Sequence, residues 1–271
     1  MIQHLAPARR CGGAIAALLL MPCVALVGQT NDESRLTMGI SAGWIASAQL
    51  WDVPRQAISS PFGDPDFYHL HRELRSDITI SGHGTYFRGP HLGFTGEFTY
   101  LGLGTTDACV VVQDGGNLEL RAACDALQGV QHSAAVTTVQ GGVVLRPWSR
   151  TFIQPYLTGT AGVAFTPRST VEMTSIYGAI GDTLVTLNIY QDDHTAEIRP
   201  SFTLGAGFAT APSSGYQLRI EVRETWLAQT IVTAATSQQG LLPPTRSVLK
   251  GFPSVLVSFD VVLEKRRGRR Y

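Results

Sequence analysis

Apolar side chains alternate with polar or small ones along most of the chain after residue 35. In the first such segment, Leu36, Met38, Ile40 and Trp44 are apolar, and the residues between them are mostly small or polar. Successive side chains of a β-strand point to opposite faces, so this period predicts strands. The same pattern covers eight segments, at about 36–50, 77–83, 92–100, 135–145, 154–165, 197–208, 216–223 and 254–263.

The connections between these segments alternate between short and long. Three are short and carry turn residues, at 88–90, 147–149 and 212–215. Four are long, at about 52–73, 104–131, 166–194 and 228–250. The sequence therefore predicts an all-β protein, an eight-stranded antiparallel up-and-down barrel with three short turns and four long loops. All long loops would lie at one end, and residues 171–190 alternate well enough to form a hairpin there.

Three features favour a barrel whose apolar face points outward into lipid. The polar face is dominated by Gly, Thr and Ser rather than Lys and Glu, and the loops are long at one end only. Aromatic residues stand near the ends of the apolar rows, as girdles at membrane interfaces would; they are Trp44, Tyr100, Phe152, Tyr216, Trp226 and Phe252. A β protein in lipid must close its hydrogen bonding into a barrel. The alternative is an exported soluble barrel that binds an apolar ligand inside.

Two stretches, residues 93–100 and 215–222, are especially typical of small outer-membrane barrels. Residues 36–264 resemble the barrel domains of the OmpA/OmpX type. The resemblance implies a transmembrane barrel in the outer membrane of a Gram-negative-type bacterium, with outer-membrane lipid as its partner. The chain departs from that family at its end, where Leu263 is followed by Glu264 and a basic tail, residues 265–271, instead of a terminal aromatic residue on the last strand.

The N-terminal segment and the cysteines indicate export. Residues 1–28 are typical of a secretory signal, with Arg9 and Arg10 before an apolar run. The remaining chain, the barrel of residues 29–264 and its tail, keeps Cys109 and Cys124, which should form a disulfide in an oxidising compartment. The net charge is zero and no domain is basic, which argues against a nucleic-acid partner.

The polar face predicts the contents of the lumen. An eight-stranded barrel is just wide enough for its inward side chains to fill it, and buried charges must be paired. We expect a plugged lumen with a salt-bridged network, and a narrow ion or solute pore is the alternative. The predicted polar network consists of Arg75, Asp77, Glu97, Gln140, Glu197, Arg199, Arg219, Glu221, Arg223 and Asp260.

Several short motifs contain residue types that could carry chemistry. Asp192-Asp193-His194 resembles half of an omptin-type protease site, but no second acidic pair matches it. His132 and Ser133 are adjacent, so they would face opposite sides of a strand rather than form a lipid-deacylase pair. The other His pairs lack a third metal ligand. We therefore expect no catalytic, cofactor or metal site, although a membrane-embedded hydrolase stays an alternative.

The long loops indicate where any recognition would take place. Loops on a rigid scaffold tolerate variation and commonly carry binding residues. The favoured role is therefore structural or surface interaction, in which the long loops could bind an extracellular ligand. The pattern leaves the oligomeric state open.

Overall fold

The structure is a computed structural model of the chain. It describes residues 32–58, 66–113, 121–122, 124–125, 128–166, 169–180, 183–194, 197–210, 215–233 and 245–267. The predicted signal, residues 1–28, and residues 268–271 of the predicted tail lie outside the described residues. None of the described segments is a helix long and apolar enough to cross a membrane.

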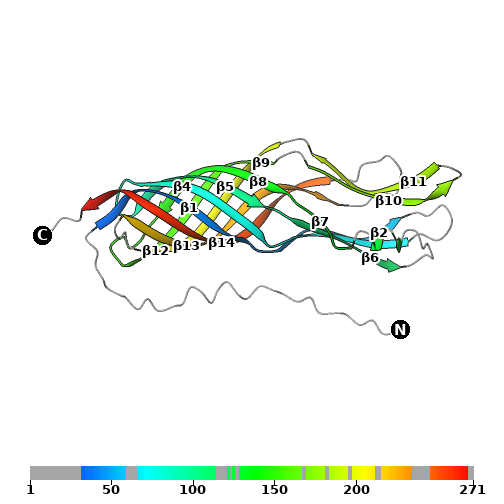
Figure 1. Cartoon of the computed structure of the whole chain (residues 1–271), viewed down its shortest axis with the longest axis horizontal. Helices are drawn as coiled ribbons and strands as arrows, with labels where there is room; N and C mark the ends of the chain where they lie inside the picture. Colours follow the sequence, from blue (N-terminus) through cyan, green and yellow to red (C-terminus); the bar gives the residue numbers. More distant parts are fainter. Residues whose placement is uncertain are drawn as a thin grey trace, which may run out of the picture.

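Eight of the described strands close into an antiparallel barrel, which confirms the predicted fold class (Figure 1). Each strand pairs with the next barrel strand along the chain, and the last pairs back to the first, so the topology is up and down. The barrel strands are β1 (Asp32–Ile45), β4 (Asp77–Phe87), β5 (Leu92–Gly102), β8 (Ala135–Leu145), β9 (Ile153–Thr166), β12 (Glu197–Thr210), β13 (Tyr216–Val232) and β14 (Thr245–Arg267).

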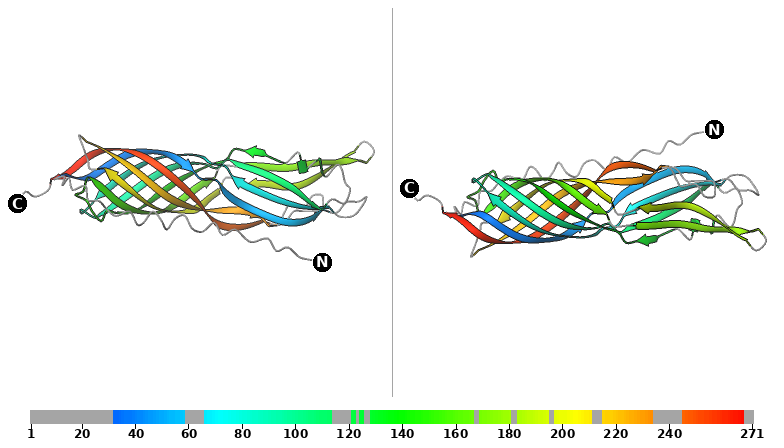
Figure 2. Two further views of the ribbon diagram at one scale, coloured as in Figure 1. Left: turned by 90° about the horizontal axis from the view of Figure 1, so that it is seen from below. Right: turned by 90° about the horizontal axis from the view of Figure 1, so that it is seen from above.

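Six further strands lie beyond one end of the barrel, opposite the end where β1 begins and β14 stops (Figures 1 and 2). A four-stranded sheet, called the outer sheet below, contains β2 (Ala48–Ile58), β3 (Asp66–Leu74), β6 (Thr105–Gln113) and β7 (Val130–His132). A separate hairpin pairs β10 (Ser169–Ile180) with β11 (Thr183–His194), as the alternation within 171–190 predicted. The first two long connections thus pair with each other through β3 and β6, which the sequence pattern did not indicate.

The first predicted strand ends earlier than its alternation suggests. β1 stops at Ile45, and β2 begins at Ala48 after a two-residue break. At the break the Ala46 amide donates to the Pro253 carbonyl of β14, 2.9 Å away. The apolar row therefore continues across a change of sheet, which a periodicity cannot reveal.

The apolar rows face outward on all eight barrel strands. Ile40 is 70% exposed and Ile198 is 68% exposed, whereas the alternate positions on the same strands are mostly small or polar and buried. Every barrel strand contributes exposed apolar residues; one from each strand, in chain order, are Ile40, Ile80, Phe98, Val143, Leu157, Leu204, Ile220 and Val257. A soluble barrel with an apolar cavity needs the opposite arrangement, so the face assignment predicted from the sequence is the one present.

Inward glycines let neighbouring strands approach closely. A Cβ atom on Gly142 of β8 would lie 2.0 Å from the Gly159 carbonyl oxygen, and one on Gly162 of β9 would lie 2.0 Å from the Val139 carbonyl oxygen. Both contacts are with backbone, which cannot move aside without disturbing the ladder between β8 and β9. Glycine is therefore required at these two positions by close backbone approach.

Candidate functional site

A buried ion pair joins opposite walls of the barrel interior. The Arg223 guanidinium on β13 binds the Glu97 carboxylate on β5, and its second terminal nitrogen donates to Ser81 Oγ at 3.3 Å. Thr99 Oγ1 donates to Glu97 Oε1 at 2.5 Å. Both charges lie among side chains rather than in water, and each is compensated by the other and by a neighbouring hydroxyl.

A second charged group lies around Arg219 on the same strand. Arg219 Nη2 is 3.3 Å from Glu221 Oε2, and its Nη1 is 3.5 Å from Asp260 Oδ2. Its guanidinium also stacks over the Tyr156 ring, 4.5 Å from the centroid, and the Tyr156 hydroxyl donates to Glu221 Oε2 at 2.8 Å. His83 Nε2 lies 2.9 Å from Asp260 Oδ1. One positive charge is thus shared between two carboxylates, and a histidine contacts the second.

Gln140 is the centre of an uncharged group. Its Nε2 donates to Ser201 Oγ at 2.9 Å, and its Oε1 accepts from Thr160 Oγ1 at 2.8 Å and from Thr203 Oγ1 at 2.9 Å. These contacts link the neighbouring strands β8, β9 and β12 along one side of the interior. Together the three groups contain six of the ten residues predicted for the polar network, namely Glu97, Gln140, Arg219, Glu221, Arg223 and Asp260.

The other four predicted residues lie at the end of the barrel next to the outer sheet. Glu197 and Arg199 form an ion pair of 2.5 Å, and Arg199 also donates to the Ala228 carbonyl at 3.0 Å. Asp77 Oδ1 accepts from the amide of Ile78 at 2.7 Å. Arg75 is exposed and donates to Gln131 Oε1 at 2.6 Å. Arg75 precedes β4 in the link from β3, where the inward and outward alternation of the barrel no longer applies.

An apolar cluster, the outer cluster, occupies the barrel interior at that same end. Its members come from six barrel strands, from β3 and from the link after β5, and none is more than 5% exposed; they are Ile45, Leu74, Leu101, Leu103, Val136, Ala164, Leu227 and Phe252. The prediction that Phe252 belongs to an interfacial girdle is wrong, because it is 1% exposed and lies inside. It has the parity of Ser254 and Ser258, which face inward, so the alternation along β14 places it inside as well.

A mixed cluster, the inner cluster, lies at the short-turn end. Phe87, Val144, Tyr156 and Ala209 pack together there. Arg146, in the turn after β8, places its guanidinium 4.0 Å from the centroid of the Phe87 ring and donates to Ser34 Oγ at 2.9 Å. Burial lowers the pKa of Arg146 to about 10, although Glu33 nearby raises it. Arg146 therefore keeps its charge at neutral pH.

The outer sheet is held by a disulfide and a buried ion pair. Cys109 of β6 is bonded to Cys124, with Cα atoms 5.3 Å apart, as the sequence predicted. On the buried face of the sheet, Arg72 Nη2 donates to Asp107 Oδ2 at 2.8 Å, and His132 Nε2 lies 3.0 Å from the same oxygen. These links tie β3, β6 and β7 into one unit above the barrel.

Within the part of the chain that the structure describes, the pairs of histidine and carboxylate lie at separate places. His69 Nε2 is 2.8 Å from Asp52 Oδ1, and the His69 and His71 rings are 5.5 Å apart. Among the described residues, no group of three or more His, Cys, Asp or Glu side chains is placed to hold a metal ion. The motif at residues 192–194 ends β11, and its side chains lie outside the described part.

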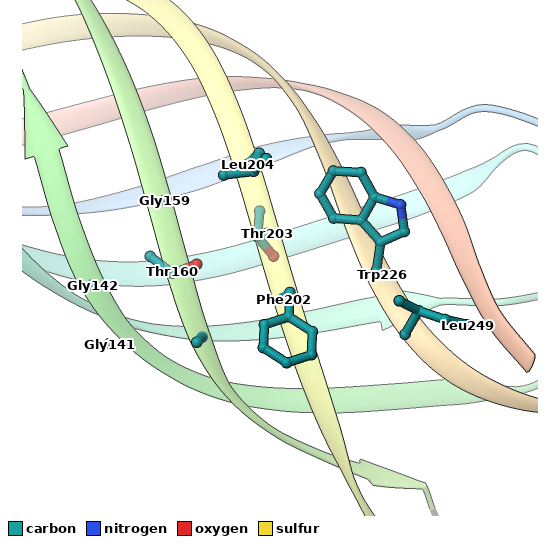
Figure 3. A pocket seen from close by; sticks show the side chains of 10 residues that line it. Gly141, Gly142, Gly159, Thr160, Phe202, Thr203, Leu204, Trp226 and Leu249 are labelled. Atoms are coloured by element: carbon teal, nitrogen blue, oxygen red, sulfur yellow. The ribbon is translucent and has the colours of Figure 1, made fainter.

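A shallow hollow of about 480 Å³ lies on the outer wall of the barrel, over β8, β9, β12, β13 and β14 (Figure 3). Gly141, Gly159 and Ala161 are among the residues that line it, and Phe202, Leu204 and Trp226 stand around it. The hollow exists because outward positions that carry large side chains elsewhere are glycine or alanine here. Its lining has no charged group, so it offers apolar contact only.

The sequence missed three interior residues that the network uses. Tyr156 and His83 stand at inward positions of their strands, so their parity was a usable signal, but the prediction kept mainly to long charged side chains. Arg146 gave no such signal, because it lies one residue beyond the end of β8.

Strand number, up-and-down order, an apolar exterior and a polar interior define a closed eight-stranded barrel, which is the fold that the resemblance to OmpA/OmpX-type barrels predicted. Neither a known protein-family model nor any curated protein sequence matches the chain. Among solved structures it is similar to the N-terminal β-barrel domain of OprF from Pseudomonas aeruginosa, at 8% identity and a TM-score of 0.32. That match covers 86% of this chain and 99% of the other.

Two other solved structures are similar over most of their length. Ail of Yersinia pestis, solved with the heparin analogue sucrose octasulfate, has 11% identity and a TM-score of 0.32, over 86% of this chain and 99% of that one. The outer-membrane protein AlkL, solved in DMPC bilayers, has 12% identity and a TM-score of 0.35, over 97% and 98%. These overlaps are loose, and the fold assignment rests on the strand order of the barrel itself.

Proposed function

We propose that the protein is an integral outer-membrane barrel with a sealed interior, which presents the outer sheet and the β10–β11 hairpin as an interaction surface outside the cell. The belt of large apolar side chains on all eight strands supports insertion into lipid, because an exposed apolar surface of this extent is not tolerated in water. On this proposal the protein is not an enzyme, and its partners are lipid and an extracellular ligand.

The observation that carries the sealed interior is the presence of buried side chains at three levels. The outer cluster fills one end, the inner cluster with Arg146 fills the other, and the Arg223 and Arg219 groups lie between them. An ion crossing this interior would have to displace close-packed apolar side chains and break compensated ion pairs. Both steps are costly.

Single-channel recording in a planar bilayer tests the seal. The wild-type protein should give no step-like conductance. A double variant that opens a cavity in the outer cluster, Leu227→Ala with Phe252→Ala, should also give no conductance. The charged groups and the inner cluster still fill the rest of the lumen. Leu204→Ala with Leu249→Ala, on the exposed outer wall, is the matched control. Regular conductance steps in the wild type would overturn the sealed barrel and favour a pore.

Orientation can be tested by trypsin treatment of intact cells. Arg121, beside the disulfide of the outer sheet, is exposed and should be cut from outside. Lys265, at the opposite end, should be cut only after the outer membrane is permeabilised. Cleavage at Lys265 in intact cells, with Arg121 protected, would reverse the proposed orientation.

A further inference from the structure

Basic side chains gather at the short-turn end of the barrel. Apart from Arg146, which packs on the inner cluster, they belong to none of the interior groups described above. Arg88 and Lys265 are exposed there. The side chain of Arg150 is 69% exposed, although its Nε is 2.9 Å from Glu33 Oε1. Arg35 is partly exposed and pairs with Glu264 at 2.6 Å. Both glutamates are thus matched by an arginine. Among the residues described at this end, Arg88, Arg146 and Lys265 still outnumber the one further carboxylate, Asp32, so the net charge is positive.

The end of β14 fixes the depth of part of this charge. Leu263 is the last exposed apolar residue of the strand, and β14 continues through Lys265 to Arg267 while paired with Asp32–Ser34 of β1. A strand rises about 3.3 Å per residue, so Lys265 lies about 5–7 Å beyond the apolar belt, given a tilted strand. The polar layer on each side of a bilayer is about as thick as that. Lys265 is therefore held at head-group depth and not on a free tail.

The opposite end of the molecule does not share this charge. Exposed carboxylates lie on and around the outer sheet and on the half of β13 nearer to that sheet. They include Asp52, Glu73, Asp125 and Glu224. Arginine and lysine also occur there, for example Arg246 and Lys250 at the other end of β14, but among these acidic neighbours. The barrel is therefore polarised along its axis.

We propose that the short-turn end binds the head groups of anionic phospholipids in the leaflet that it enters. Lysine and arginine at head-group depth attract phosphodiester and carboxylate groups and form charge-assisted hydrogen bonds with them. A lipid is favoured over a soluble polymer because Lys265 lies directly beside the apolar belt, where acyl chains contact Leu263. The inference rests on the proposed function in placing this end at a membrane surface.

Lipid selectivity of the full-length protein tests the proposal. The protein is reconstituted into vesicles of phosphatidylcholine with roughly 20–30% phosphatidylglycerol, which gives about as strong a surface potential as anionic leaflets carry. Spin-labelled phosphatidylglycerol and spin-labelled phosphatidylcholine then report which lipid is held at the barrel. We expect a preference for phosphatidylglycerol that falls with added salt.

The variant Arg88→Gln with Lys265→Gln should reduce this preference about fivefold or more, since one basic residue near an anionic surface is worth about 1 kcal/mol, or about fivefold. Arg246→Gln with Lys250→Gln removes the same charge from the other end and should leave the preference unchanged. Equal binding of the two lipids by the wild type, or an equal loss in both variants, would overturn the proposal. So would retention of soluble polyglutamate by the detergent-solubilised protein without lipid preference, which would indicate a polymer partner.

The same samples separate this inference from the proposed function. A folded barrel migrates differently in a detergent gel before and after boiling. Failure to insert and to give that heat-dependent shift would overturn the membrane barrel, and the lipid site with it. A normal shift without lipid preference would overturn the lipid site alone.

Discussion

Arginine at position 257 should be one of the most damaging substitutions on the barrel exterior. Val257 lies near the middle of β14, between Ala42 of β1 and Ile220 of β13, and it is 51% exposed. If its surroundings are lipid, Val257→Arg places a charge near the middle of the bilayer. Such substitutions on the lipid face of barrels cost about 2–4 kcal/mol.

The neighbouring residue provides a matched control because it faces the other way. Ser258 is 3% exposed, and its Oγ donates to Ser41 Oγ at 2.7 Å. Ser258→Ala removes one neutral hydrogen bond in the interior, at about 1 kcal/mol. In a water-soluble protein, a charge at an exposed position usually costs less stability than a change at a buried position. Membrane insertion predicts the reverse order, with a larger loss for Val257→Arg than for Ser258→Ala.

Reversible unfolding of the full-length protein in phospholipid vesicles, by guanidinium titration, measures both free energies of unfolding. We expect Val257→Arg to lower the midpoint strongly and Ser258→Ala to lower it slightly. A negligible loss for Val257→Arg, with a larger loss for Ser258→Ala, would mean that water surrounds the apolar belt. That result would refute the membrane assignment.

Three further predictions concern the interior and the outer sheet. Arg223→Met should cost about 3–5 kcal/mol in the same titration, because it leaves Glu97 buried without its partner; adding Glu97→Gln should recover much of that loss, and additive losses would deny the pairing. Phe252→Ala should cost about 3–5 kcal/mol by opening a cavity in the outer cluster, and a loss below about 1 kcal/mol would place Phe252 outside it. Reduction of the Cys109–Cys124 bond should make the outer sheet protease-sensitive while the heat-dependent gel shift of the barrel persists, and the unreduced intact mass should be two hydrogens short of the thiol form; two free thiols in the exported protein would contradict the disulfide.

The barrel could be predicted because a strand between lipid and a narrow interior has two different faces along its whole length. Apolar residues such as Ile40 and Ile220 occur at every second position for that reason, and turn residues mark each short connection. The outer sheet lacks this regularity. The ladder between β3 and β6 joins two loops distant in sequence, and the periodicity of either loop alone carries no information about its partner.

The interior could be predicted in part. Alternation puts Glu97, Arg219, Glu221, Arg223 and Asp260 on inward positions, and buried charges require partners. Alternation alone does not show at which height in the lumen the polar side chains give way to apolar ones. The outer cluster uses the same inward parity as the charged groups, so only the height of a residue such as Phe252 along its strand separates the two.

Nitroxide accessibility at Ile220 tests the central claim most directly. Ile220 is an exposed apolar residue of β13, and Arg246 is exposed at the outer-sheet end of β14. In a background in which Cys109 and Cys124 are replaced by serine, a nitroxide is attached to cysteine at either position in protein reconstituted into vesicles. Outward-facing Ile220 predicts high collision rates with oxygen and low rates with a water-soluble nickel complex, and the Arg246 site predicts the opposite. Strong nickel access at position 220 would show that the apolar belt faces water and would contradict the membrane barrel.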